Sequence, residues 1–129
     1  MKFRLFFLGL LFIVPAFSKP ARLLIFTGSD WCPNCRRLEK KILKDTLFIN
    51  FARDNIRIEF VDFPQHVRQD PDVIARNKAL AEKYNFMGVY PTILLLNAGD
   101  SLMGQIFYKN QSPEEFIEQI RLILPGNKQ

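Results

Sequence analysis

The sequence predicts a single α/β domain with a central mixed sheet, made of a parallel βαβ half and an antiparallel hairpin, with helices on both faces. Short apolar runs suited to buried strands alternate with amphipathic helical patterns in the first half of the chain. Two later strand patterns flank a short turn that contains a glycine. With 129 residues, 48% of them hydrophobic and 24% charged, the chain has room for one ordinary globular core.

The first half of the chain has the order strand, helix, strand. Residues 22–26 form a short apolar run that suits a buried parallel strand. After the two cysteines, apolar residues at helical spacing and charges on the other face predict an amphipathic helix to about Ala52, with or without a break. Residues 56–63 are rich in β-branched and aromatic side chains and stop at Pro64, as a second strand would. A right-handed crossover should join the two strands.

The second half adds a helix, a hairpin and a final helix. Asp70, followed by a proline, predicts the N-cap of a helix over residues 72–84. Strand patterns at 92–96 and 101–108 flank a four-residue turn and predict an antiparallel hairpin. The sequence SPEE at 112–115 is a capping box that opens the last helix. Helices are therefore available to cover both faces of the sheet.

Residues 1–18 have the layout of a secretory signal peptide. Lys2 and Arg4 precede an uncharged apolar run at 5–14, and small residues follow at the positions of a cleavage site. The apolar run is shorter than the roughly 20 residues that span a bilayer. We therefore expect removal of the segment, a single mature domain at 19–129, and a periplasmic or otherwise extracytoplasmic location where disulfides persist.

The charge distribution gives no sign of a nucleic-acid partner. Without Lys2 and Arg4 the chain keeps sixteen lysines and arginines against thirteen acidic residues. No segment gathers basic and aromatic residues into a face that would bind a nucleic acid. We therefore expect no partner of that class.

The two cysteines of the chain lie three positions apart in TGSDWCPNC, residues 27–35. As a structural staple the pair would be poor, because a bridge over two intervening residues closes a very small loop. A zinc site needs four ligands, and the single histidine, His66, lies in a polar segment far from Cys32 and Cys35. We expect no bound metal, and we expect His66 to be an exposed loop residue. A redox pair is the remaining reading.

A redox role agrees with the position of the pair at a strand-to-helix junction. Cys32 falls at the start of the helix, where free N–H groups and the helix dipole favour a thiolate. Pro33 suits the first helical position because its missing N–H would have no partner there. Cys35, one turn further and expected to be more buried, can attack a mixed disulfide on Cys32. Arg36 and Arg37 add positive charge nearby.

Two motifs together resemble the thioredoxin superfamily. WCPNC at 31–35 follows a strand pattern, and GVYPT at 88–92 precedes one, over a resemblance that extends from about residue 21 to residue 124. The residues in and around these motifs are most similar to those of exported bacterial thioredoxin-like proteins. The resemblance implies a thioredoxin fold and thiol–disulfide exchange without a metal or an organic cofactor.

The resemblance also implies which residues meet the substrate. Pro91 is expected to be cis, and the backbone of Tyr90 is expected to pair with an extended client segment as an added strand. Trp31, Pro33 and Asn34 complete the expected substrate-binding surface beside Cys32 and Cys35. The clients would be protein thiols and disulfides.

The chain departs from the family at two places. Many thioredoxins have a buried aspartate six residues before the first cysteine, where it manages the proton of the buried thiol; here that position is Phe26. Asp30 and Asp62 are the candidate replacements. The dipeptide between the cysteines is Pro-Asn, whose leading proline is similar to that of glutaredoxins and of the oxidant DsbA.

The resemblance implies a monomeric reductase of protein disulfides that takes electrons from a membrane-bound partner. Reduction is favoured because the segment between residues 62 and 92 is too short for the helical insertion of DsbA. A disulfide-forming oxidant and an isomerase of the same fold are the alternatives. A different class of alternative is a non-enzymatic module that binds extended peptides.

Overall fold

The computed structural model describes residues 19–126, so the predicted signal peptide at 1–18 lies outside the described residues. The elements follow the predicted order. They are β1 (Ala21–Thr27), α1 (Pro33–Leu38), the π-helical turn η1 (Glu39–Leu43), α2 (Thr46–Asn55), β2 (Ile56–Asp62), α3 (Pro71–Lys83), β3 (Thr92–Leu96), β4 (Leu102–Ile106) and α4 (Pro113–Ile123). Within residues 19–126, no helix combines the length and the apolar character that a membrane span requires.

The sheet has four strands in the order β2-β1-β3-β4. β1 pairs with β2 in parallel, from Ala21 opposite Ile56 to Thr27 opposite Asp62. β3 pairs with β1 and with β4 in antiparallel orientation. The predicted mixed sheet, with a parallel half and an antiparallel hairpin, is therefore confirmed, and β1 lies in its centre.

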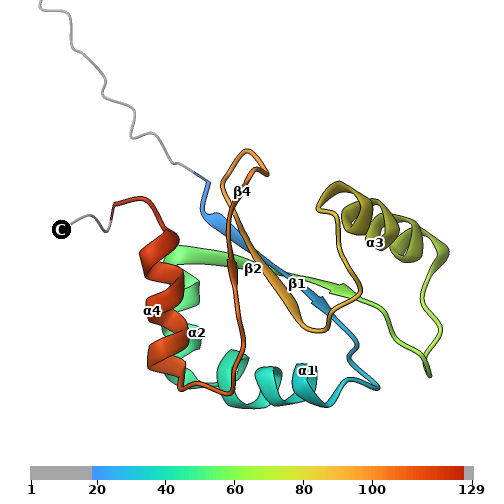
Figure 1. The fold of residues 1–129 in the computed structure, drawn as a ribbon, viewed down its shortest axis with the longest axis horizontal. Helices are drawn as coiled ribbons and strands as arrows, with labels where there is room; N and C mark the ends of the chain where they lie inside the picture. The colour runs from blue at the N-terminus through green and yellow to red at the C-terminus, as the bar shows by residue number, and fades with distance from the viewer. Residues whose placement is uncertain (1–18, 127–129) are drawn as a thin grey trace, which may run out of the picture.

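Alternate residues of β1 serve two separate cores. Leu23 and Ile25 pack against α1, α2 and α4 on one face of the sheet, whereas Leu24 and Phe26 face α3 on the other. Figure 1 shows this arrangement, with α3 on one side of the strands and α2 and α4 side by side on the other. Because successive side chains of a strand point to opposite faces, a central strand that is covered on both faces is apolar throughout.

The long helix predicted after the cysteines is divided. α1 passes into the π-helical turn η1, the chain turns at Lys44, and α2 then begins. Asp45 is the N-cap of α2, because its carboxylate accepts a hydrogen bond from the N–H of Leu47 at 2.9 Å. The division lets the first part carry Cys35 at its start while the second part packs against α4.

The predicted caps are confirmed, and the predicted strand ends differ by one or two residues. Asp70 caps α3 by accepting from the N–H of Asp72 at 2.8 Å. Ser112 and Glu115 form both hydrogen bonds of the capping box at the start of α4. β2 ends one residue earlier than predicted, and β4 is shorter at both ends. Strand ends depend on pairing with neighbouring strands, which the sequence pattern does not contain.

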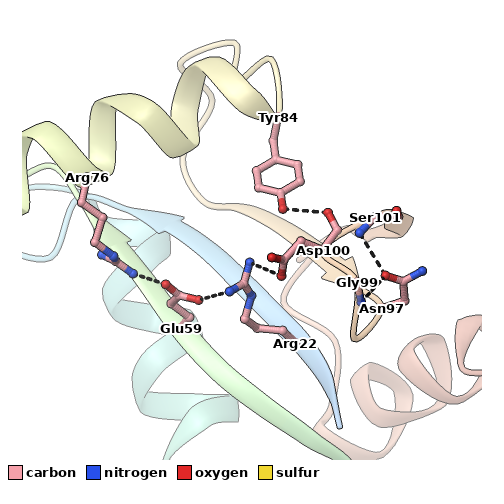
Figure 2. A network of polar contacts seen from close by, with 8 residues as sticks. All are labelled: Arg22, Glu59, Arg76, Tyr84, Asn97, Gly99, Asp100 and Ser101. Carbon is pink, nitrogen blue, oxygen red and sulfur yellow. Dashed lines mark hydrogen bonds and ion pairs between the residues drawn. The ribbon is translucent and has the colours of Figure 1, made fainter. Parts of the chain in front are cut away.

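A chain of ion pairs ties α3 and the β3–β4 turn to the sheet (Figure 2). Arg76 of α3 pairs with Glu59 of β2, which also pairs with Arg22 of β1 at 3.0 Å. Arg22 in turn contacts Asp100 of the turn at 2.9 Å, and the hydroxyl of Tyr84 donates to the backbone oxygen of Asp100. Arg22 lies near the start of β1, so this network holds the end of the sheet away from the cysteines.

Candidate active site

Cys32 and Cys35 form a disulfide at the junction between β1 and α1, with their Cα atoms 5.3 Å apart. Cys32 is the N-cap of α1 and has an extended backbone conformation. The N–H of Cys35 points at the Sγ atom of Cys32 at 3.2 Å. Pro33 occupies the first turn, as predicted. A sulfur in this position receives a backbone N–H that would stabilise its thiolate form.

A turn at Gly28 brings Cys32 to the start of the helix. The backbone oxygen of Gly28 accepts hydrogen bonds from the N–H groups of Trp31, at 3.3 Å, and of Cys32, at 2.9 Å. A Cβ atom at position 28 would overlap the indole ring of Trp31. Glycine is therefore required by this close approach. In the sequence Gly28 marks only the end of a strand, so its contact with the indole ring was missed.

An aromatic cluster links the cysteine loop to the loop before β3. The indole N–H of Trp31 donates to the backbone oxygen of Phe63 at 2.8 Å, and the indole ring meets Tyr90 edge-on with centroids 4.9 Å apart. Tyr90 also contacts the rings of Phe63 and Phe86 edge-on. Burial raises the pKa of Tyr90 above its ordinary value. The Tyr90–Pro91 peptide bond is cis. The sequence pattern predicts Phe63 only as part of a strand and gives no signal for Phe86 at the site.

The residues predicted to meet the substrate differ in exposure. Pro33 and Asn34 are exposed, whereas Trp31, Tyr90 and Pro91 are half-buried. The contact between Trp31 and Tyr90 brings the two motifs together. Pro33 and Asn34 begin α1, whereas Tyr90 and Pro91 belong to the loop before β3.

The two cysteines are almost equally buried. The exposed fraction is 4% for Cys32 and 3% for Cys35. The sequence predicts a more buried Cys35, and the difference in the structure is small. In the disulfide form, access alone does not separate the attacking sulfur from the resolving one.

A cavity of about 280 Å³ lies behind Cys35. Its apolar lining comes from residues of β1, β2, α1 and η1, and its polar lining is Thr27, Ser29, Glu39 and Asp62. Asp62 accepts from the N–H of Ser29 at 2.9 Å and also from the Ser29 hydroxyl. Of the two acidic residues that the sequence proposed for proton transfer, Asp62 therefore shares a cavity with Cys35.

Phe26 does not lie behind Cys35. It is fully buried on the α3 face of the sheet, where its ring stacks on Phe86 with centroids 4.5 Å apart. The next residue, Thr27, lines the cavity behind Cys35. The position six residues before Cys32 therefore lies on the opposite face of β1 from the cavity, and the residues of β1 that line the cavity with Cys35 are Ile25 and Thr27.

Asp30 holds the loop that follows β2. Its carboxylate accepts hydrogen bonds from three successive backbone N–H groups, those of Gln65 at 2.9 Å, His66 at 2.7 Å and Val67 at 3.1 Å. Desolvation acts to raise the pKa of Asp30, but these bonds and the nearby His66 hold it below its ordinary value. The Asp30 carboxylate therefore stabilises the loop after β2. Because both its oxygens already accept hydrogen bonds there, it is a poor candidate for accepting the proton of the Cys35 thiol.

We predict that Asp30→Asn lowers the free energy of unfolding at neutral pH but not in acid. A carboxylate whose pKa is lowered by folding stabilises the folded state above its ordinary pKa of 3.8, and this contribution is lost as the pH falls through the lower folded value. Urea unfolding of both proteins across this pH range should show curves that differ near pH 7 and converge in acid. A difference that persists unchanged into acid would contradict the assignment.

Metal ligands are not gathered in the described part of the chain. Among residues 19–126, no group of three or more histidine, cysteine, aspartate and glutamate side chains is arranged to hold a metal ion. His66 lies in an exposed loop and is engaged through its backbone N–H by Asp30. The chemistry that the described residues offer at Cys32 and Cys35 is that of a dithiol and its disulfide.

Known proteins resemble this chain in sequence and in structure. The chain is 27% identical over 101 residues to the disulfide bond reductase DsbH of Chlamydia pneumoniae. The aligned region covers 78% of this chain and 60% of that protein. The chain thus spans about three-fifths of the length of this curated relative. A solved structure of a DsbH oxidoreductase superimposes with a TM-score of 0.78 at 25% identity, over 84% of this chain and 74% of that one.

A more distant structure agrees in fold, and a family model covers most of the chain. The disulphide isomerase of Xylella fastidiosa Temecula1 superimposes with a TM-score of 0.59 at 18% identity, over 81% of this chain and 78% of that one, which is a likeness of fold alone. The model of a thioredoxin-like domain matches residues 14–122. The mixed sheet, the Cys32–Cys35 disulfide and this match lead to one conclusion: the chain belongs to the thioredoxin-like domain family and has the thioredoxin fold.

Proposed function

We propose that this protein catalyses thiol–disulfide exchange through Cys32 and Cys35. The observation that carries the proposal is the position of the pair, because the Sγ of Cys32 caps α1 and receives the N–H of Cys35. When the disulfide is reduced, that N–H and the free N–H groups of the helix start favour the thiolate of Cys32. A thiolate is the form of cysteine that attacks a disulfide.

The exchange proceeds in two steps. The thiolate of Cys32 attacks one sulfur of a client disulfide, the client S–S bond breaks, and one client thiolate leaves. Cys35 then loses its proton and attacks the Sγ of Cys32, which releases the second client thiolate and forms the Cys32–Cys35 disulfide. Two electrons pass from the protein to the client. Asp62, which shares the cavity behind Cys35, accepts the proton of that thiol through water.

The client binds across the two motif loops. Its extended segment pairs with the backbone at Tyr90, beside Pro91, as an added strand. Trp31, Pro33 and Asn34 border the position at which its sulfur would meet Cys32. The apolar side chains of Met87 and Val89, in the same loop as Tyr90, are 78% and 64% exposed.

The direction that we propose is reduction of protein disulfides. It is supported by the name of the curated relative, a disulfide bond reductase, and by the absence of room for a long insertion between Asp62 and Thr92. We further propose that residues 1–18 are removed on export. The monomeric domain at 19–129 then works outside the cytoplasm and is kept reduced by a membrane-bound donor.

The equilibrium reduction potential of the pair tests the direction. Trp31 is the single tryptophan of the chain and lies next to Cys32, so its fluorescence should report the redox state in graded thiol buffers. A value near the thioredoxin end of the family scale, about −270 mV, is expected of a reductase, whereas a value near about −120 mV would make this protein an oxidant. The double variant Cys32→Ser/Cys35→Ser is the control, because without either sulfur it should show no redox-dependent change.

A further inference from the structure

The positive charge of the described chain is concentrated next to the cysteine pair. Residues 19–126 contain fifteen lysines and arginines and thirteen aspartates and glutamates. Residues 36–44, which form the rest of α1, η1 and the turn after it, hold five of these basic residues and one acidic residue. Ten basic and twelve acidic residues remain elsewhere. The segment at 36–44 is therefore basic while the rest of the described chain is slightly acidic.

The basic residues of this segment form an exposed face with little internal neutralisation. We call Arg36, Arg37, Lys40 and Lys41 the basic face; all four side chains are exposed. Within the described residues, none of the four has an ion pair with a carboxylate, whereas Lys44 pairs with Glu39 at 3.5 Å.

The hydrogen bonds of the basic face leave its charge in place. Arg37 donates to the amide oxygen of Asn34 at 2.9 Å and Lys41 to that of Asn110 at 3.3 Å. Both acceptors are uncharged amides, so they orient the cations without neutralising them. Like charges one turn apart, as in Arg36 and Lys40, disfavour a helix slightly. Repulsion among these four cations thus slightly destabilises the isolated protein.

The position of the basic face points to the client. Arg36 directly follows Cys35, and Arg37 is held by Asn34, which lies between the two cysteines. The basic face thus begins within one helical turn of the cysteine pair, so a protein whose disulfide reaches Cys32 comes within range of its charges. Charges grouped beside a reactive site raise the rate at which oppositely charged partners associate with it.

We propose that the basic face docks an acidic segment of the client protein next to the disulfide that is exchanged. The inference rests on the proposed function and specifies its substrate class: clients with aspartate or glutamate residues close to the reactive cysteine. Complementary charges steer such clients to Cys32, while the exposed Met87 and Val89 offer an apolar contact in the Tyr90 loop. The acidic segment interacts with the four cations in the encounter complex, before the sulfur exchange.

The test uses the pre-reduced protein and short peptides that differ only in charge. Each peptide carries one cysteine as a mixed disulfide with thionitrobenzoate, flanked by glutamates, glutamines or lysines at the same positions. Release of thionitrobenzoate gives the second-order rate constant. At low ionic strength the glutamate peptide should react about tenfold faster than the glutamine peptide, and the lysine peptide more slowly. In about 1 M salt the rates should converge.

Matched variants separate the basic face from net charge. The glutamate-to-glutamine rate ratio should fall to one or below in Lys40→Glu/Lys41→Glu, and to an intermediate value in Lys40→Gln/Lys41→Gln. The control Arg57→Glu/Lys78→Glu makes the same change in net charge at exposed positions on β2 and α3, and it should keep the ratio. Because each value is a ratio within one variant, any change in the thiolate itself cancels.

The outcomes distinguish this inference from the proposed function. A ratio of one in the unaltered protein at low salt, or an equal loss in the face variant and its control, would overturn the acidic-client inference alone. Release from none of the peptides would overturn the proposed function and the inference with it. A ratio of one combined with binding to phosphatidylglycerol vesicles that Lys40→Glu/Lys41→Glu abolishes would overturn the inference in favour of a membrane contact.

Discussion

Cys32→Ser should lower the rate of disulfide exchange by at least about a thousandfold, to the level of the uncatalysed reaction. A serine hydroxyl does not ionise near neutral pH, so the variant has no nucleophile at the position that caps α1. Cys35→Ser should keep the first attack and lose the second, because its Cys32 is intact. The measurement is the rate of thionitrobenzoate release together with mass spectrometry of the product.

The two variants also settle which sulfur attacks, which burial does not decide. With Cys35→Ser, a stable mixed disulfide between Cys32 and the client should accumulate. With Cys32→Ser, no such adduct should form at a comparable rate. The reverse pattern, in which Cys32→Ser traps the client, would exchange the two roles. A circular dichroism spectrum of each variant provides the control for folding.

Phe26→Ala should lower the free energy of unfolding by about 3–5 kcal/mol. The ring is fully buried and stacks on Phe86, so its removal takes apolar surface from the α3 core and leaves a cavity. Phe107→Ala is the matched control, because that ring is 57% exposed and its loss should change stability by much less. Urea unfolding followed by circular dichroism measures both effects.

The same variant tests the link between this core and the candidate active site. Phe86 contacts Tyr90, and Tyr90 contacts Trp31, so a cavity at Phe26 should alter the surroundings of the indole ring. We expect a shifted Trp31 emission in the folded variant. An unfolding free energy within about 1 kcal/mol of the Phe107→Ala value would contradict the role of Phe26 as a core residue.

Local signals in the sequence were sufficient for most of the fold. Apolar periodicity located the strands and helices, and the caps at Asp70 and Ser112 located two helix starts. These signals operate over a few residues, so a single sequence contains them. The π-helical turn was seen only as a permitted break, because the divided helix is decided by how its two parts pack on the sheet and on α4.

The parts of the site that the sequence missed depend on contacts between distant segments. The Asp30 carboxylate binds backbone groups more than thirty positions away, and Trp31 binds the backbone oxygen of Phe63. Every residue type offers a backbone carbonyl oxygen, and all but proline a backbone N–H, so the sequence does not indicate which backbone group a side chain will bind. The place of Phe26 on the α3 face could not be predicted for a related reason, because the face that a residue of β1 occupies is decided by how the strand packs in the sheet.

α3 is held on the sheet largely by polar contacts, whereas α2 and α4 on the other face are held by a large apolar core. The fully buried residue of α3 is polar, Asn77, whose amide donates to the backbone oxygen of Asp62, and the Arg76–Glu59 pair is the next anchor. Apolar burial is the main source of cooperative stability, so this half should open more readily in hydrogen exchange than the half built on α2 and α4. Phe63 and Phe86, which support Tyr90, flank α3 in the chain. The surface offered to clients could thus adapt in shape while the opposite half, behind the cysteines, stays rigid.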